Sequence, residues 1–374
     1  MKKSVLFLLP FMIIPFATSC GNYRKINLAY GQMIDNQLTD ISYSSLASMI
    51  EDKKTFVLTV APITPGCACW AHFKVILQSY ISKNHITVYT INGKEFYNAE
   101  SKLMDTFGLT ILSGNETFAI FENGKLRQHR VYNEKDMIFK QEKDFEKYME
   151  EVVNLPKAFE INLTQLDSIY ASGKEAVIYF ARNNCSDCSY VDTHYLKQYI
   201  EENSSMNNMY ILDCESLGIR VYDNEGQLTP DSKIAWQNFK DKYGLSNTVN
   251  TELGYNTGYV PTFQLIKGNG VSYGTSVLSM SVAFNDTISE VDGKYVVTDS
   301  YYTTERAEKL SYTAKVDTKV LKGLELTADD VNVIEIGSNF KYIYWTHKSA
   351  EKYHNPLLKA FLDENLPKVT HSFE

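Results

Sequence analysis

The feature that most constrains the fold is an order of elements that occurs twice along the chain. A short apolar strand at residues 55–61 leads into a cysteine-containing loop at 66–70 and then into a helical pattern. A second apolar strand at 175–181 leads in the same way into a cysteine-containing loop at 184–188 and a helix. Further strands and helices follow each loop, and a helix closes each half. Strands that alternate with helices predict an α/β sandwich around a central sheet, built twice.

The predicted organisation has two domains in tandem. The chain has 374 residues, of which 44% are hydrophobic, and this can supply a core to each domain. We place the first domain at residues 41–154 and the second at 155–374, and read the segment 286–339 as an insertion in the second domain. Residues 21–40 are polar and weakly periodic, so we expect a tether there.

Residues 1–20 have the layout of a secretory signal. A basic start with Lys2 and Lys3 is followed by a short apolar run and by small residues that end in Cys20. The run is broken by prolines and is shorter than the roughly 20 residues of a membrane-spanning helix. This segment resembles the signals of bacterial lipoproteins. The resemblance implies that Cys20 is lipidated and holds the protein at the cell membrane on its extracytoplasmic face. The alternative is ordinary secretion, with Cys20 incidental.

Composition excludes several classes of protein. The formal net charge of −8 argues against a nucleic-acid binder, which needs a basic surface. Six cysteines in a chain of this length are too few for a disulfide scaffold, so their placement needs another explanation. Outside the cytoplasm thiols oxidise and disulfides persist.

The pair Cys185 and Cys188 lies where a Cys-x-x-Cys spacing carries redox chemistry. It follows a buried strand and opens a helix, so Cys185 is predicted at the helix N-terminus, where unpaired N–H groups stabilise a thiolate. Cys188 comes one turn later and can close a disulfide with it. The spacing also occurs in metal sites, and a structural disulfide or a zinc site remains as an alternative.

The segment Val260-Pro261-Thr262 strengthens the redox reading. It precedes an apolar strand and, together with the Cys-x-x-Cys pair, it resembles the thioredoxin-like family, in which the cysteines face a cis-proline. The resemblance implies two tandem thioredoxin-like domains, each a three-layer α/β/α sandwich with a central mixed β-sheet. It also implies that Cys185 is the attacking thiol, Cys188 the resolving thiol and Pro261 the cis-proline. Val260 and Thr262 would then contact an extended substrate segment.

Two departures from that family bear on the chemistry. The family often has a buried acid on the strand before the cysteines, which takes the proton of the second thiol, but Ile178 and Tyr179 stand near its place here. Asp187 lies inside the motif, and its charge is expected to disfavour a Cys185 thiolate. Cys214 ends another apolar strand and is predicted to be a buried, inert thiol.

The first half has a weaker motif. Cys67 and Cys69 are separated by a single residue, and Glu116 stands where the cis-proline would be expected. If Cys69 corresponds to Cys188, Gly66 takes the place of Cys185. The pair is a possible second dithiol, reactive or isomerase-like. The alternatives are an interaction domain derived from the same fold, or a copper site that includes His72.

These patterns together predict a membrane-anchored thiol–disulfide oxidoreductase. Its expected substrates are thiols and disulfides of exported or surface proteins, with a separate redox protein as its electron partner and without cofactor, metal or nucleic acid. The alternative is a non-catalytic binding or export-accessory lipoprotein that uses the same fold.

Overall fold

The computed structural model describes residues 24–33, 38–63, 66–98, 116–245, 260–266, 277–281, 287–299, 323–336 and 340–373. The predicted signal, Cys20 and parts of the predicted insertion lie outside these residues. Within them, no helix combines the length and the apolar character that crossing a membrane requires.

The first half is a five-stranded mixed sheet between two helical layers. Its strand order is β3-β5-β4-β6-β7, in which β3, β5 and β4 are parallel and β6 and β7 are antiparallel. The strands are β3 (Leu38–Asp40), β4 (Phe56–Ala61), β5 (Val88–Asn92), β6 (Thr117–Glu122) and β7 (Lys125–Val131). The helices are α1 (Tyr43–Glu51), α2 (Ala68–Asn84), α3 (Gly93–Asn98), η2 (Met137–Phe139) and α5 (Glu142–Val152).

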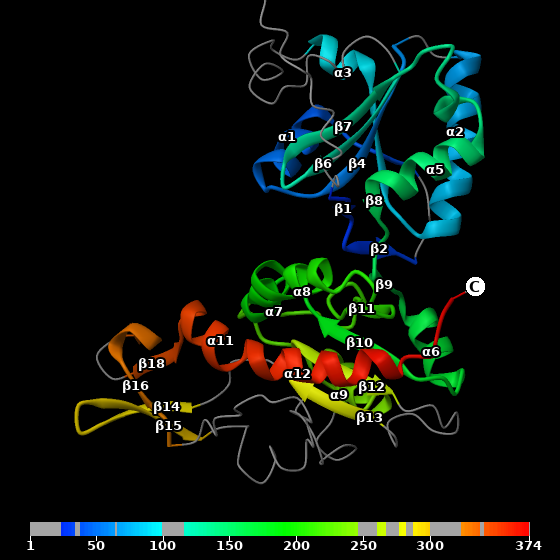
Figure 1. Ribbon diagram of the computed structural model, residues 1–374. Helices are drawn as coiled ribbons and strands as arrows, with labels where there is room; N and C mark the ends of the chain where they lie inside the picture. Colours follow the sequence, from blue (N-terminus) through cyan, green and yellow to red (C-terminus); the bar gives the residue numbers. More distant parts are fainter. Residues whose placement is uncertain are drawn as a thin grey trace, which may run out of the picture.

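Alternation along the strands divides the first core between the two faces of the sheet. Phe118 and Ile120 of β6 pack with α2 and α5, whereas Ala119 and Phe121 pack with α1. Figure 1 shows α1 on one side of this sheet and α2 and α5 on the other. Helices on both faces are the reason that the central strand β4 is apolar at every position but Thr59.

The second half repeats this arrangement. Its sheet has the order β13-β12-β10-β11-β9-β2, with β2, β9, β11 and β10 parallel and β12 and β13 antiparallel. The strands are β2 (Tyr30–Gln32), β9 (Ala158–Glu160), β10 (Ala176–Ala181), β11 (Met209–Asp213), β12 (Thr262–Ile266) and β13 (Val277–Ser281). The helices are α6 (Leu163–Ala171), α7 (Ser186–Val191), the π-helical turn η3 (Asp192–Leu196), α8 (Lys197–Glu202) and α9 (Pro230–Lys242).

Two helical layers enclose this sheet as well. Tyr170 of α6 contacts Tyr243, which follows α9, so these helices share one face. On the other face, Tyr199 of α8 donates a hydrogen bond of 2.9 Å to Asp363 of the C-terminal helix α12 (Asn355–Asn365). Both halves are therefore three-layer α/β/α sandwiches with the same strand order, and the predicted tandem thioredoxin-like fold is confirmed.

The segment expected to be a tether instead forms short strands that pair with strands of both halves. The short strand β1 (Ile26–Asn27) pairs with β8 (Val153–Asn154) at the end of the first half. Directly afterwards β2 adds an edge strand to the sheet of the second half by pairing with β9. These strands are two or three residues long, too short to show the alternation by which strands are recognised in a sequence.

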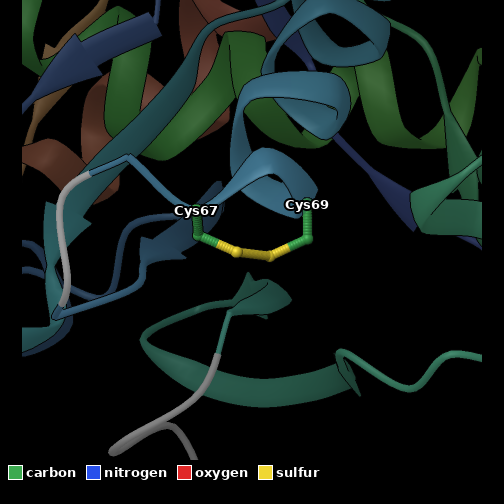
Figure 2. The surroundings of a disulfide bond; sticks show 2 residues. All are labelled: Cys67 and Cys69. Atoms are coloured by element: carbon green, nitrogen blue, oxygen red, sulfur yellow. A yellow bond between two sulfur atoms is a disulfide. The ribbon is translucent and has the colours of Figure 1, made fainter.

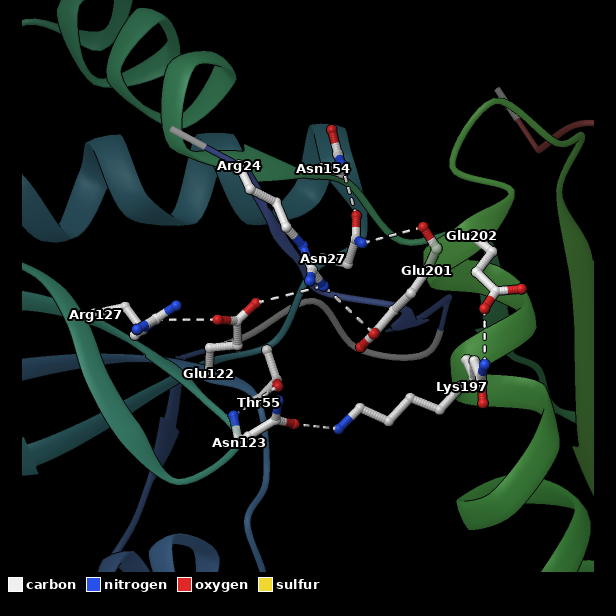
Figure 3. A network of polar contacts seen from close by, with 11 residues as sticks. Arg24, Asn27, Thr55, Glu122, Asn123, Arg127, Asn154, Lys197, Glu201 and Glu202 are labelled. Carbon is white, nitrogen blue, oxygen red and sulfur yellow. Dashed lines mark hydrogen bonds and ion pairs between the residues drawn. The ribbon is translucent and has the colours of Figure 1, made fainter. Parts of the chain in front are cut away.

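Polar contacts also join the two halves, between the β6–β7 turn, the N-terminal segment and α8. Lys197 Nζ on α8 donates to Asn123 Oδ1 in the β6–β7 turn at 2.8 Å, and Asn27 Nδ2 donates to the Glu201 carbonyl at 3.4 Å. Arg24 lies within 3.9 Å of Glu122 in the first half and 3.6 Å of Glu201 in the second. Figure 3 shows these groups between the β6–β7 turn and α8.

The region read as an insertion forms small sheets beside the second half (Figure 1). Its apolar side chains Ile288, Val297, Leu326 and Val331 belong to the same hydrophobic cluster as the second sheet. The elements are β14 (Thr287–Val291), β15 (Lys294–Asp299), β16 (Glu325–Leu326), η4 (Ala328–Asp330), β17 (Val331–Ile336) and β18 (Phe340–Trp345). The predicted closing helix is split into α11 (His347–Tyr353) and α12, because Pro356 begins a new helix instead of continuing the first; the short turn η5 (Leu366–Lys368) follows.

Candidate functional site

Cys185 and Cys188 meet at the edge of the second sheet where β10 ends. Cys185 is the N-cap residue of α7, with extended backbone (φ −103°, ψ 121°), and its Sγ accepts a hydrogen bond from the Cys188 N–H at 3.3 Å. Both residues are free thiols, and Cys185 is 8% exposed whereas Cys188 is fully buried. The more accessible thiol is thus the one that caps the helix.

The segment at 260–262 lies against this thiol. The Val260–Pro261 peptide bond is cis, and the Cys185 Sγ donates to the Val260 carbonyl oxygen at 3.5 Å. Thr262 is fully buried and pairs with Phe180 at the end of β10, which fixes the segment beside the cysteine loop. The structure therefore brings together the five residues that were predicted to form one site.

The surroundings favour a thiolate at Cys185. The hydrogen bond from the Cys188 side chain is the largest cause that lowers the pKa of Cys185, and the Cys188 backbone N–H adds to it. Burial opposes them, and the Asp187 charge raises the pKa as expected but is a smaller effect. The same interaction with Cys185, together with burial, raises the pKa of Cys188. The two thiols are therefore unlike: one is readily ionised and the other holds its proton.

An acid that the sequence reading missed lies beside Cys188. Asp192 comes four residues later on the same helical run, so it faces the same side one turn away. Burial raises the pKa of Asp192 to about 6, and Cys185 adds to the shift. Its charge in turn raises the pKa of Cys188. The signal in the sequence is the spacing Cys-x-x-x-Asp, which places an acid one helical turn after Cys188.

Two tyrosines lie close to Asp192. The Tyr179 ring of β10 stacks on Phe263 of β12, with centroids 4.4 Å apart, and its hydroxyl interacts with Asp192. From the N-terminal segment, the Tyr30 hydroxyl donates to the Asp192 backbone carbonyl at 3.5 Å. The segment expected to be a tether thus contacts the residue that directly follows α7.

The remaining cysteine of this half, Cys214, follows β11 and is a buried thiol. Cys214 is fully buried, its Sγ contacts the Leu212 carbonyl at 4.0 Å, and burial raises the pKa of its thiol. Over the described ranges, no cluster of three or more His, Cys, Asp or Glu side chains is placed to bind a metal ion.

Cys67 and Cys69 form a disulfide at the N-terminus of α2 (Figure 2). The predicted correspondence with the second half is wrong, because Cys67 is the N-cap residue of α2 just as Cys185 is that of α7. Cys67 therefore corresponds to Cys185, and Cys69 corresponds to Asp187 rather than to Cys188. The loop between β4 and its cysteine is longer than the loop between β10 and its cysteine. Matching the two halves by cysteine spacing alone therefore pairs the wrong residues.

Solved structures with a similar fold are known, at low sequence identity. No protein-family profile and no curated protein sequence matches the chain. A mutant thioredoxin from Halobacterium salinarum NRC-1 is 13% identical, with 32% of this chain and 94% of that chain covered and a TM-score of 0.24. Human ERp44 (form II) is 9% identical, with 62% of this chain and 50% of that chain covered and a TM-score of 0.31. A thioredoxin from Trypanosoma brucei brucei is 11% identical over 31% of this chain and 93% of that chain, with a TM-score of 0.22.

Proposed function

We propose that the chain is a thiol–disulfide oxidoreductase whose working residues are Cys185 and Cys188. The observation that carries the proposal is the position of the Cys185 sulfur, at a helix N-terminus and 3.5 Å from the Val260 carbonyl next to cis-Pro261. A thiolate is the nucleophile in disulfide exchange, and the lowered pKa of Cys185 supplies one near neutral pH.

The reaction proceeds through a mixed disulfide. The Cys185 thiolate attacks one sulfur of a substrate disulfide, the substrate S–S bond breaks, and the other substrate sulfur leaves as a thiolate. Cys188 then gives its proton to Asp192 and attacks the Cys185 sulfur, which releases the second substrate sulfur. The substrate is reduced to a dithiol and the protein is oxidised to a Cys185–Cys188 disulfide. A dithiol of a redox partner protein reduces it again, and the same steps in reverse oxidise a substrate.

The substrate lies along the segment that precedes β12. An extended peptide placed beside Cys185 can use backbone groups of Val260, as in the addition of a strand to a sheet edge. The contact with Thr262 expected from the sequence is wrong, because Thr262 is fully buried between β10 and β13. We propose that these peptides belong to exported or surface proteins, because the sequence pattern at residues 1–20 indicates lipid attachment at Cys20 and an extracytoplasmic position.

The test is reduction of insulin disulfides by dithiothreitol, with the protein as catalyst. The soluble chain from Asn22 to Glu374 is expected to accelerate insulin precipitation, and Cys185→Ser is expected to abolish the acceleration. Cys214→Ala is the matched control, since it removes a fully buried thiol whose pKa is raised by burial. Equal rates for the parent and Cys185→Ser would refute the enzymatic proposal and favour a binding module.

A further inference from the structure

Glu116 is a buried acid at the edge of the first sheet. Its side chain is only 3% exposed, and neither carboxylate oxygen has a hydrogen-bond partner among the residues that the structure describes. A buried carboxyl group without partners costs free energy, so its presence calls for a physical reason.

The strand registers show where this acid lies. Thr117 pairs with Val60 in the first half, and Thr262 pairs with Phe180 in the second half. Glu116 therefore occupies the position of Pro261, the residue that lies beside the reactive cysteine in the second half.

The face of the sheet gives the direction of the side chain. Residues two apart share a face, so Glu116 points to the same side as Phe118, which packs against α2. Cys67 caps this helix and Cys69 lies in its first turn. Figure 2 shows the disulfide that joins Cys67 to Cys69 at the start of α2. Both cysteines are half-buried, which leaves the disulfide open to a reactant from outside.

The surroundings keep most of this acid protonated below about pH 7. Burial alone raises the pKa of Glu116 to about 7. The charges on the neighbouring elements are engaged elsewhere: Arg130 of β7 pairs with Asp136 before η2 at 3.5 Å, and the His72 ring on α2 bonds to the Lys140 carbonyl at 2.9 Å.

We propose that Cys67–Cys69 is a second thiol–disulfide exchange site, in which Glu116 donates a proton to the departing cysteine sulfur. The reactant is a dithiol of a protein or of a small molecule. This inference stands on the first half alone and does not depend on the function of Cys185.

The step balances as a two-electron transfer. A reactant thiolate attacks one cysteine sulfur, the Cys67–Cys69 bond breaks, and the other sulfur leaves with the electron pair and takes the Glu116 proton. The Glu116 carboxylate then accepts the proton of the second reactant thiol, which attacks the mixed disulfide. The cysteine released in this way is protonated from solvent. The reactant dithiol is oxidised to a disulfide, and Cys67 and Cys69 become thiols.

The experiment isolates this site in the soluble chain from Asn22 to Glu374 carrying Cys185→Ser and Cys188→Ser. Dithiothreitol is the probe, and reduction of Cys67–Cys69 is followed by quenched alkylation and mass spectrometry between about pH 5 and pH 9. Rates are divided by the thiolate fraction of the probe. The corrected rate is expected to fall as the pH rises through the pKa of Glu116, because a carboxylate has no proton to donate.

Glu116→Gln is expected to slow the reaction about tenfold at pH 6 and to remove the pH dependence. Glu116→Met, a second side chain that cannot ionise, is expected to behave in the same way, and circular dichroism checks that both variants are folded. Glu134→Gln is the matched control, because Glu134 is an exposed acid of the same half. An unchanged pH profile in both Glu116 variants would overturn the role of Glu116. A Cys67–Cys69 disulfide that dithiothreitol does not reduce in the parent would overturn the site.

Discussion

Asp192 shows how a single side chain can replace a group that the preceding strand lacks. Tyr179 occupies the strand position near which an acid was expected, and its hydroxyl interacts with Asp192 from across the sheet surface. The carboxyl group therefore reaches the Cys188 thiol from the helix side. With its pKa raised to about 6, Asp192 is ionised at neutral pH and still basic enough to take a proton.

Asp192→Asn is expected to slow the resolution of mixed disulfides. Without the carboxylate, Cys188 must lose its proton to water, so we expect a loss of about tenfold or more at pH 7. In the parent the resolution rate should rise as the pH passes through about 6, and in the variant this rise should be absent. Rapid-quench mass spectrometry of the reduced protein mixed with glutathione disulfide measures the lifetime of the mixed disulfide.

The control for this prediction is Asp231→Asn, which changes an exposed acid on α9. Its mixed disulfide should have the lifetime seen in the parent. If Asp192→Asn keeps both the rate and the pH dependence of the parent, Asp192 is not the proton acceptor.

Glu116 also makes a prediction about stability. Its pKa is raised from 4.5 to about 7 in the folded protein, so ionisation is easier in the unfolded chain. This lowers the stability of the parent progressively as the pH rises from about 4.5 to about 7. Glu116→Gln removes the ionisation, and we expect its free energy of unfolding to exceed that of the parent by roughly 2–3 kcal/mol at pH 8. The gain should vanish near pH 4. Urea unfolding at both pH values measures it, and a difference independent of pH would contradict the burial of an acid here.

At the scale of elements, long apolar strands and amphipathic helices could be predicted from the sequence, and short edge strands could not. The strands β4 and β10 are apolar at nearly every position because helices cover both faces, and both were predicted within a residue of their observed ends. By contrast, β2 owes its place to pairing with β9, a contact between residues far apart in the sequence. The start of α2 was also beyond prediction, because loop length rather than cysteine spacing decides which residue caps the helix.

Gly31 shows how tightly β2 is held between the halves. A Cβ atom at this position would lie 2.5 Å from the His85 carbonyl oxygen and 2.9 Å from the Phe159 ring. The same carbonyl accepts a hydrogen bond of 3.0 Å from the Gln32 N–H. Neither the β2 backbone nor the His85 backbone can move away without breaking this hydrogen bond.

Gly31→Ala is therefore expected to destabilise the protein. Forcing a methyl group into this space should lower the free energy of unfolding by about 1–3 kcal/mol. Asp40→Ala, at an exposed position on the edge strand β3, should change it by less than about 0.5 kcal/mol. Thermal and urea unfolding of both variants make the comparison. A Gly31→Ala protein as stable as the parent would show that β2 is loosely attached.

At the scale of the whole molecule, the two halves have the same fold but different cysteine sites. In the second half a free dithiol lies beside a cis-proline, and in the first half a disulfide lies at the edge where Glu116 takes the proline's place. The strands β1 and β2 and the polar contacts around Glu201 join the halves into one molecule. The tandem arrangement could be predicted from the repeated order of elements, whereas this junction could not, because it depends on contacts between distant residues.

The central claim is that Cys185 attacks and Cys188 resolves. The most direct test is trapping with the soluble chain from Asn22 to Glu374 and a disulfide-containing protein substrate such as insulin. The Cys188→Ser variant is predicted to accumulate a covalent adduct through Cys185 that dithiothreitol releases, because the resolving thiol is missing. Cys185→Ser is predicted to form none. An adduct that forms equally well without Cys185, or no adduct in either variant, would contradict the claim.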